Sequence, residues 1–240
     1  SDQQAQYLKM HRYRYIYTLQ VLNRFLPVNN FLEIGSSGLF LKLIETLCPT
    51  AQVFGTQYSN ESSFKKEEVP FRGWGLYGFY FGNPERFPYL ISQESFDLVL
   101  CAEVIEHMTI DPMALLAEIN RILVVGGKVV ITTPNIVSSR SILASLEHRM
   151  PFNFYAFNTS GSADRHNIEY SPELLVEIVK AAGFEIEELA TSNAWSLPDQ
   201  RIEKIFSAFN FSDELRGDDI IVSDIKTRDV IQRYPDILYI

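Results

Sequence analysis

The fold class is decided by residues 31–45, FLEIGSSGLFLKLIE, near the start of the chain. The apolar residues that open this stretch are typical of a buried strand, and the periodic apolar residues that close it are typical of a helix. Between them, Gly35 and Gly38 indicate a tight turn where the backbone can approach a ligand, and a helix N-terminus there favours a negative group. The turn lacks the G-x-G-x-x-G spacing of dinucleotide-binding folds. The stretch therefore predicts a strand, a ligand-binding turn and a helix.

The rest of the chain alternates predicted strands with predicted helices. Strands are expected at residues 30–34, 52–56, 76–81, 96–101, 128–133, 185–190 and 219–224, and helices at residues 3–26, 39–47, 112–123, 172–182 and 200–209. This alternation favours an α/β fold with a mostly parallel sheet and helices on both faces. Ser171 is the expected N-cap and Gly183 the expected C-cap of one helix, and Gly126-Gly127 is expected to end another. Residues 134–170 carry few regular signals and are interpreted as an inserted lid.

Length and composition indicate one globular domain, residues 1–240, with a helical cap at residues 1–28. The 30 Asp and Glu outnumber the 21 Lys and Arg, and the net charge of −9 makes a nucleic-acid partner unexpected. The two Cys lie in apolar surroundings, and neither a membrane-spanning run nor a signal-peptide pattern is found. We therefore expect a cytoplasmic protein with no membrane span; its oligomeric state stays open.

The motifs resemble those of class I S-adenosylmethionine (SAM) methyltransferases. An acid stands two residues before the first glycine of the turn, as in that family's first motif, although Ser37 and Leu39 replace two of its usual glycines. The runs ESFDLVLCAEVIEHM and DPMALLAEINRILVVGGKVVITTPN resemble the fourth-strand to fifth-strand region, and GDDIIVSDIKTR resembles the last, antiparallel strand. The resemblance implies a Rossmann-like fold. Its sheet would have seven mostly parallel strands with one antiparallel strand, helices on both faces and a lid insertion after the fifth strand.

The same resemblance implies where SAM would bind. Glu33, Gly35, Ser36 and Gly38 would hold its methionine end, and Gln57 and Tyr58 would lie at its ribose and adenine. Gln57 stands where the family usually has an acid, and an amide bonds a hydroxyl without charge assistance. The adenine edge would meet Asn83, Pro84 and Glu85, and the sulfonium would be bordered by Cys101, Ala102 and Glu103.

The segment AEVIEHM places two carboxylates and an imidazole close together in sequence. If a short helix begins where the strand at residues 96–101 ends, Glu103, Glu106 and His107 fall at i, i+3 and i+4, on one helical face. His166, in ADRHNIEYSP, could complete a set of four metal ligands. Mixed carboxylate and imidazole ligation suits Mn²⁺, Fe²⁺ or Zn²⁺, whereas Mg²⁺ usually takes more oxygen ligands.

This set of four has parallels in known families. EVIEHM, TPN and a His before an aliphatic-Glu-aromatic stretch resemble the small-RNA 2′-O-methyltransferases, whose two Glu and two His bind a divalent ion. That resemblance implies a metal site of Glu103, Glu106, His107 and His166. Ubiquinone-pathway O-methyltransferases share the Glu-x-x-Glu-His part. The alternative is a metal-free site in which His107 or His166 is the catalytic base and Glu106 orients it.

The same segment, with DRHN and RYPDILY, resembles methyltransferases of bacterial surface-polysaccharide pathways from end to end. The prediction is therefore methyl transfer from SAM to a hydroxyl of a sugar or glycan precursor, with or without a divalent metal. An RNA 2′-O-methyltransferase and a non-catalytic SAM-binding module are the alternatives.

Aromatic and basic residues flank the predicted site. The rings of WGLYGFYF are interpreted as buried strand residues, and those at residues 152–157 as core or as the lining of a sugar site. The tyrosines of the leading helix are expected to pack or to cover the cofactor. Lys9, Arg12 and Arg14 are interpreted as solvated charge, with a phosphate of an activated sugar as the alternative partner.

Overall fold

The computed structural model describes residues 8–9, 11–59, 65–71, 73–86, 88–109, 111–151, 165–193, 200–210, 212 and 214–227. Its strands are β1 (Asn30–Ile34), β2 (Gln52–Tyr58), β3 (Lys65–Phe71), β4 (Gly75–Gly82), β5 (Phe96–Ala102), β6 (Leu123–Pro134), β7 (Phe184–Ser192) and β8 (Asp219–Lys226). Its helices are α2 (Arg12–Asn23), α3 (Leu39–Leu47), α4 (Pro112–Ile122), α5 (Ser139–Leu146), α6 (Pro172–Ala181) and α7 (Gln200–Phe209), with a 3₁₀ turn, η1 (Ile105–His107).

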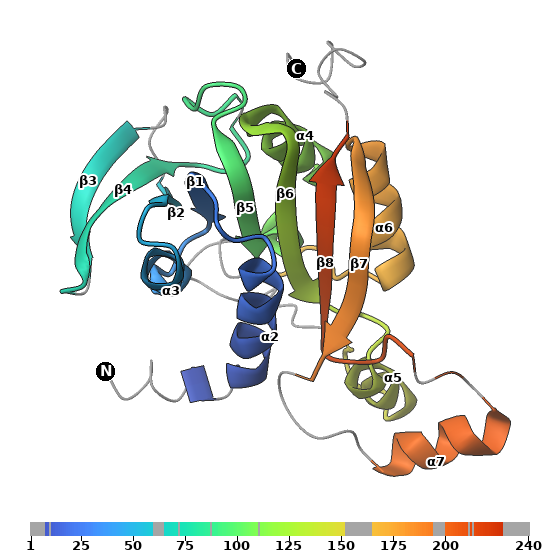
Figure 1. The fold of residues 1–240 in the computed structure, drawn as a ribbon. Coiled ribbons are helices and arrows are strands. Elements are labelled where there is room, and N and C mark those ends of the chain that lie inside the picture. The colour runs from blue at the N-terminus through green and yellow to red at the C-terminus, as the bar shows by residue number, and fades with distance from the viewer. Residues whose placement is uncertain are drawn as a thin grey trace.

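The strands form one eight-stranded sheet in the order β3-β4-β2-β1-β5-β6-β8-β7 (Figure 1). Strands β4, β2, β1, β5 and β6 run parallel to one another, and β8 is antiparallel to both β6 and β7. The predicted mostly parallel sheet with an antiparallel last strand is confirmed. The expected count of seven was one short, because β3 adds an antiparallel edge strand beside β4. Its sequence, KKEEVPF, is polar enough to read as a loop.

Helices cover both faces of the sheet. Alternate residues of each strand point to opposite faces, so Phe31 packs with α2 and α3 while Leu32 packs with α4 and α6. The predicted strand rings are buried: Tyr77, Phe79 and Tyr80 belong to these two clusters. The interpretation of WGLYGFYF as a buried strand is therefore correct for these three rings.

Several predicted boundaries moved. Gly126-Gly127 does not end a helix, because α4 ends at Ile122 and β6 runs through both glycines. The expected lid at residues 134–170 contains a helix, α5, whose Ser138 N-cap accepts a hydrogen bond from Ser141. Residues 152–164, including the aromatic residues 152–157, lie outside the described part of the chain.

The predicted N-cap of α6 is correct, but its C-cap is Ala182 and the predicted Gly183 comes one residue later. Ser171 is its N-cap, with its side chain accepting a hydrogen bond from the Leu174 amide. Gly183 follows the last residues of the helix with a φ of 86°, a left-handed conformation that glycine adopts readily. In the part of the chain that is described, no helix is both long and apolar enough to cross a bilayer.

The topology decides where a ligand can bind. The strand order reverses at β1, which has β2 on one side and β5 on the other. In open parallel sheets a crevice forms at this point, beyond the carboxyl ends of the strands. The turn after β1, residues 35–38, lies at this crevice.

Candidate active site

The turn after β1 is held by a short chain of hydrogen bonds. The Ser36 hydroxyl donates to the Glu33 carboxylate (2.6 Å) and accepts from the Gly38 amide (2.9 Å). The Gly35 amide donates to the Thr56 hydroxyl on β2 (2.9 Å). Gly35 has a φ of 66°, and a Cβ there would lie 2.7 Å from Val104. Glycine is therefore required both by the backbone conformation and by the close approach of the segment after β5.

Glu33 is the acid of the predicted first motif. It is almost fully buried, and burial raises the pKa of its carboxyl group to about 7, although the Ser36 hydroxyl and nearby amides oppose this shift. A carboxyl group with that pKa can change charge when a cationic group of a ligand approaches it.

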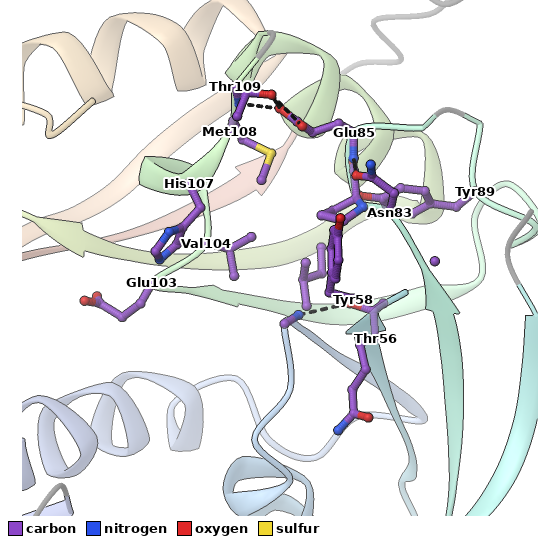
Figure 2. Close-up of a pocket in the computed structure, with 15 residues that line it drawn as sticks. Thr56, Tyr58, Asn83, Glu85, Tyr89, Glu103, Val104, His107, Met108 and Thr109 are labelled. Atoms are coloured by element: carbon purple, nitrogen blue, oxygen red, sulfur yellow. Dashed lines mark hydrogen bonds between the residues drawn. The ribbon is translucent and has the colours of Figure 1, made fainter. Parts of the chain in front are cut away.

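A cavity of about 330 Å³ opens beside this turn (Figure 2). Its lining comes from the carboxyl ends of β1, β2 and β4 and from the segments that follow β4 and β5. Among the predicted cofactor residues it is lined by Gly35, Gln57, Tyr58, Asn83, Pro84, Glu85 and Glu103. This volume lies at the lower end of the range for small-molecule sites.

Two contacts fix the far wall of this cavity. The Glu85 carboxylate accepts hydrogen bonds from the amide and hydroxyl of Thr109, as Figure 2 shows. The Tyr89 hydroxyl donates to the Pro84 carbonyl (2.9 Å). The segment after β4 is therefore tied to the segment that carries His107.

A second cavity, of about 180 Å³, also borders this turn. Glu33 and Ala102 line it, and Gly35 and Glu103 line both cavities. Ser36 and Gly38 line neither cavity and act inside the turn. Arg14, Tyr15 and Thr18 of α2 complete the second cavity.

The expected helix at AEVIEHM is shorter than predicted and begins later. Only Ile105–His107 form the 3₁₀ turn η1, and Glu103 precedes it with a φ of 55°. Glu103 therefore does not share a helical face with Glu106 and His107, and the expectation of one common face was wrong. A non-glycine residue in this conformation is strained, and such strain concentrates at functional sites.

The Glu103 carboxylate faces α2 and β6. It accepts a hydrogen bond from Arg14 Nη1 (2.7 Å) on one oxygen and from the Thr132 hydroxyl (2.9 Å) on the other. In Figure 2 its side chain points away from the His107 ring. The assignment of Glu103 as a metal ligand stays a prediction.

The other three predicted ligands converge. One ligand atom each of Glu106, His107 and His166 lies within 4.8 Å of the others. The two imidazole rings meet edge to face, with their centroids 4.9 Å apart. His107 Nε2 lies 3.8 Å from Glu106 Oε1. The two histidines are 59 residues apart in sequence. They meet because the segment after Arg165 packs against η1, where the Asn167 amide donates a hydrogen bond to the Glu106 carbonyl.

Each imidazole is held through Nδ1. His107 Nδ1 lies 3.0 Å from the Arg165 carbonyl, and His166 Nδ1 lies 2.8 Å from the Glu169 carboxylate. A neutral ring that donates from Nδ1 carries its lone pair on Nε2. Both rings can therefore offer Nε2 to a proton or a cation.

Glu106 is fully buried, and its Oε2 accepts a hydrogen bond from the Thr133 hydroxyl (3.0 Å). Oε1 has no hydrogen-bond partner among the described residues. Burial, then the nearby Glu103 charge, raises the pKa of Glu106 well above its usual value. A buried carboxylate oxygen without a hydrogen-bond partner, 3.8 Å from His107 Nε2 and close to the His166 ring, fits a divalent cation, so these three residues could hold one.

The comparisons with known proteins agree with this geometry. Residues 32–131 match the family model of a methyltransferase domain. The fold resembles a SAM-dependent methyltransferase, possible histamine N-methyltransferase, from Thermotoga maritima (TM-score 0.59, 20% identity, covering 94% of this chain and 95% of that one). It also resembles a SAM-dependent methyltransferase from Archaeoglobus fulgidus (TM-score 0.60, 16% identity, covering 91% and 97%). The chain has the class I methyltransferase fold.

A third similar structure is the N-methyltransferase NodS from Bradyrhizobium japonicum WM9 in complex with S-adenosyl-l-homocysteine (TM-score 0.52, 14% identity, covering 90% of this chain and 86% of that one). No curated protein sequence matched the chain. Together, the matches show that the chain has the fold of SAM-dependent methyltransferases. The prediction of fold class is confirmed.

Sequence reasoning missed several residues of the site. Thr132 and Thr133 bind the two glutamates, and their position at the carboxyl end of a buried strand was the available signal. Arg14 is buried and bonded to Glu103, so its interpretation as solvated charge was wrong. Arg14, Thr18 and Val21 are buried at i, i+4 and i+7, and this spacing could have shown that they share a packed face.

Proposed function

We propose that this protein transfers a methyl group from SAM to a hydroxyl of a sugar or glycan precursor. The observation that carries the proposal is the cluster of Glu106, His107 and His166 beside the 330 Å³ cavity, which His107 also lines. A sugar hydroxyl is almost wholly protonated at neutral pH and is a poor nucleophile, so it needs a base or a cation beside it. The cluster can supply either.

In the metal-free form of the proposal, His107 is the base. The Arg165 carbonyl holds the proton on Nδ1, so Nε2 is the atom that takes the hydroxyl proton. Glu106, whose Oε1 lies 3.8 Å from Nε2, orients the ring. His166 orients the acceptor or shares the base role, with the Glu169 carboxylate fixing its ring.

In the metal-assisted form, Glu106, His107 and His166 hold a divalent cation, and Glu103 is the predicted fourth ligand. When bound, the cation would supply Lewis-acid chemistry that lowers the pKa of an acceptor hydroxyl. The residues suit Mn²⁺, Fe²⁺ or Zn²⁺ better than Mg²⁺, because two of the three converging ligands are imidazoles.

Alignment is the other task of the protein. Methyl transfer is an in-line displacement, so acceptor oxygen, methyl carbon and sulfur must lie on one line. Gly35 and Glu103 line both cavities, so they lie where the nucleoside and amino-acid parts of SAM would join. Glu103 would border the sulfonium there, and His107 is near enough to line the same cavity.

The test is incubation with SAM, with and without Mn²⁺, and three acceptor classes: sugars and glycan precursors with vicinal hydroxyls, small RNA, and primary amines. Mass spectrometry of a methylated sugar is the expected result. Methylation of RNA alone would favour the 2′-O-methyltransferase alternative. Methylation of amines alone would contradict hydroxyl transfer, and binding of S-adenosylhomocysteine (SAH) without any transfer would favour the non-catalytic alternative.

A further inference from the structure

We propose that Arg14 binds the carboxylate at the amino-acid end of the cofactor, so that helix α2 is part of the cofactor site. The inference rests on the proposed function, because it takes SAM as the ligand. It assigns a residue from a helix that lies outside the sequence motifs.

Arg14 occupies a position in α2 where an apolar residue would be expected. It belongs to the buried face of the helix, with Thr18, Val21 and Leu22, and its side chain is only 6% exposed. Its Nη1 donates to Glu103 (2.7 Å) and lies 3.7 Å from Asp219 at the start of β8. It also lines the 180 Å³ cavity beside the turn after β1.

Stability alone is a weak reason for an arginine at this position. Burying an ion pair costs desolvation of both charges, and replacing it by packed apolar residues is often neutral or stabilising. The cavity wall gives a better reason, since an arginine there can meet a ligand with its planar set of N–H donors.

The charges around the small cavity match an amino acid. Of the described residues that line it, Arg14 is the only cation, whereas Glu33 and Glu103 are carboxyl groups. The amino-acid end of SAM carries one ammonium and one carboxylate, so its ammonium suits the acidic side and its carboxylate suits Arg14. A doubly charged phosphate of an activated sugar would be repelled by the two acids, which makes it the poorer partner.

The two cavities also have the right relation to each other. Gly35 and Glu103 line both, so one ligand can extend from the larger cavity to the smaller. The larger one has the size for a nucleoside, and the smaller one has space for a short charged chain. Arg14 lies in the smaller cavity only.

The test compares three ligands by calorimetry on the full chain. SAH has both charged groups, S-adenosyl-3-thiopropylamine lacks the carboxylate, and 5′-methylthioadenosine lacks the whole amino-acid end. The variants are Arg14→Gln and Arg14→Lys. Arg12→Gln is the matched control, because Arg12 is on the same helix but exposed and bonded to Tyr13.

For Arg14→Gln we expect SAH affinity to fall about 10- to 100-fold, with the affinities of the two ligands without a carboxylate unchanged. Arg14→Lys should lose less, and Arg12→Gln nothing. Unchanged SAH affinity in Arg14→Gln would overturn the inference while leaving the proposed function standing, as would an equal loss for all three ligands. A wild-type protein that binds none of the three would overturn both.

Discussion

At the scale of single residues, the chemistry of the candidate site depends on three side chains: Glu106, His107 and His166. The three are brought together from two segments, and both rings are held so that Nε2 is available. Under the proposed function this arrangement serves acceptor activation, whereas a packed apolar cluster would serve stability as well. The chemistry of the site can therefore be tested one side chain at a time.

His107→Gln is expected to lower kcat for methylation of the acceptor by about 10²- to 10⁴-fold. The reason is that His107 is the member of the cluster that also lines the larger cavity. SAH binding should stay close to wild type. Steady-state kinetics and calorimetry check this. His148→Gln is the control, since His148 lies after α5, away from the cluster, and equal losses in both variants would contradict the assignment.

Glu106→Gln tests the metal-assisted form. The substitution keeps the size of the side chain and its acceptor for Thr133 but removes the charge that would ligate a cation. We expect Mn²⁺ affinity, measured by calorimetry, to fall by more than the roughly 10- to 100-fold typical of outer-shell changes. Glu169→Gln, which alters only the support of His166, should fall within that range. If the wild-type protein has no affinity for Mn²⁺, the metal-assisted form is contradicted and the metal-free form of the mechanism remains.

Glu33 makes stability depend on pH. Its pKa is raised by burial to about 7 in the folded protein, so the folded state holds a proton that the unfolded state releases above its ordinary pKa of 4.5. The stabilising effect of that proton is present below about pH 4.5 and is lost as the pH rises to about 7. Glu33→Gln should remove this component, about 3 kcal/mol at most. Urea unfolding at several pH values checks it, and parallel pH curves for both proteins would contradict it.

At the scale of elements, the site depends on where strands end and how the next segment turns. The turn after β1 and the segment after β5 approach so closely that Gly35 faces Val104 without room for a methyl group. The short η1 turn has a similar effect, because it leaves Glu103 facing α2 instead of the histidines. Local backbone geometry therefore places the Glu103 carboxylate with Arg14 and the Glu106 carboxylate with the two histidines.

Gly35→Ala is expected to weaken SAH binding by at least about 10-fold, because the new Cβ forces Val104 or the turn to move. Gly126→Ala is the matched control. Gly126 also has a positive φ, 81°, but nothing lies within 4 Å of an added Cβ. Both variants should lose about 1–2 kcal/mol of stability from backbone strain, and only Gly35→Ala should lose binding. Calorimetry and thermal unfolding separate the two effects, and equal binding losses would show that strain alone is responsible.

At the scale of the whole molecule, the candidate cofactor site joins elements that are distant in the chain. Residues from α2 and from the ends of β1, β2, β4 and β5 line the two cavities. A ligand that contacts all of these elements in the folded state has no equivalent site in the unfolded chain, so its binding free energy adds to folding stability.

SAH at about 100 times its Kd should therefore raise the unfolding free energy by about 2.7 kcal/mol. For a chain of this size, the Tm should rise by roughly 5–10 °C in a thermal-unfolding experiment. ATP, which shares the adenosine but has a triphosphate in place of the amino acid, should give no comparable shift. Equal shifts with both ligands would indicate a site selective for adenosine alone.

The sequence by itself determined the fold class and the turn after β1, because hydrophobic periodicity and glycine conformation are local properties of the chain. The cavity residues that follow strand ends were expected from the resemblance to class I methyltransferases. The edge strand β3 could not be predicted in this way, because its polar residues form a strand only through pairing with β4.

Only the tertiary structure decided which side chains of the candidate site contact one another. The meeting of His107 with His166 requires a return of the chain across 59 residues, and the pairing of Arg14 with Glu103 spans 89. Such contacts are set by the packing of α2 and of residues 165–167 on the sheet. The physical reason is that the direction of a side chain follows from its backbone conformation and its neighbours. Sequence spacing determines that direction only inside regular elements, and Glu103 lies outside one.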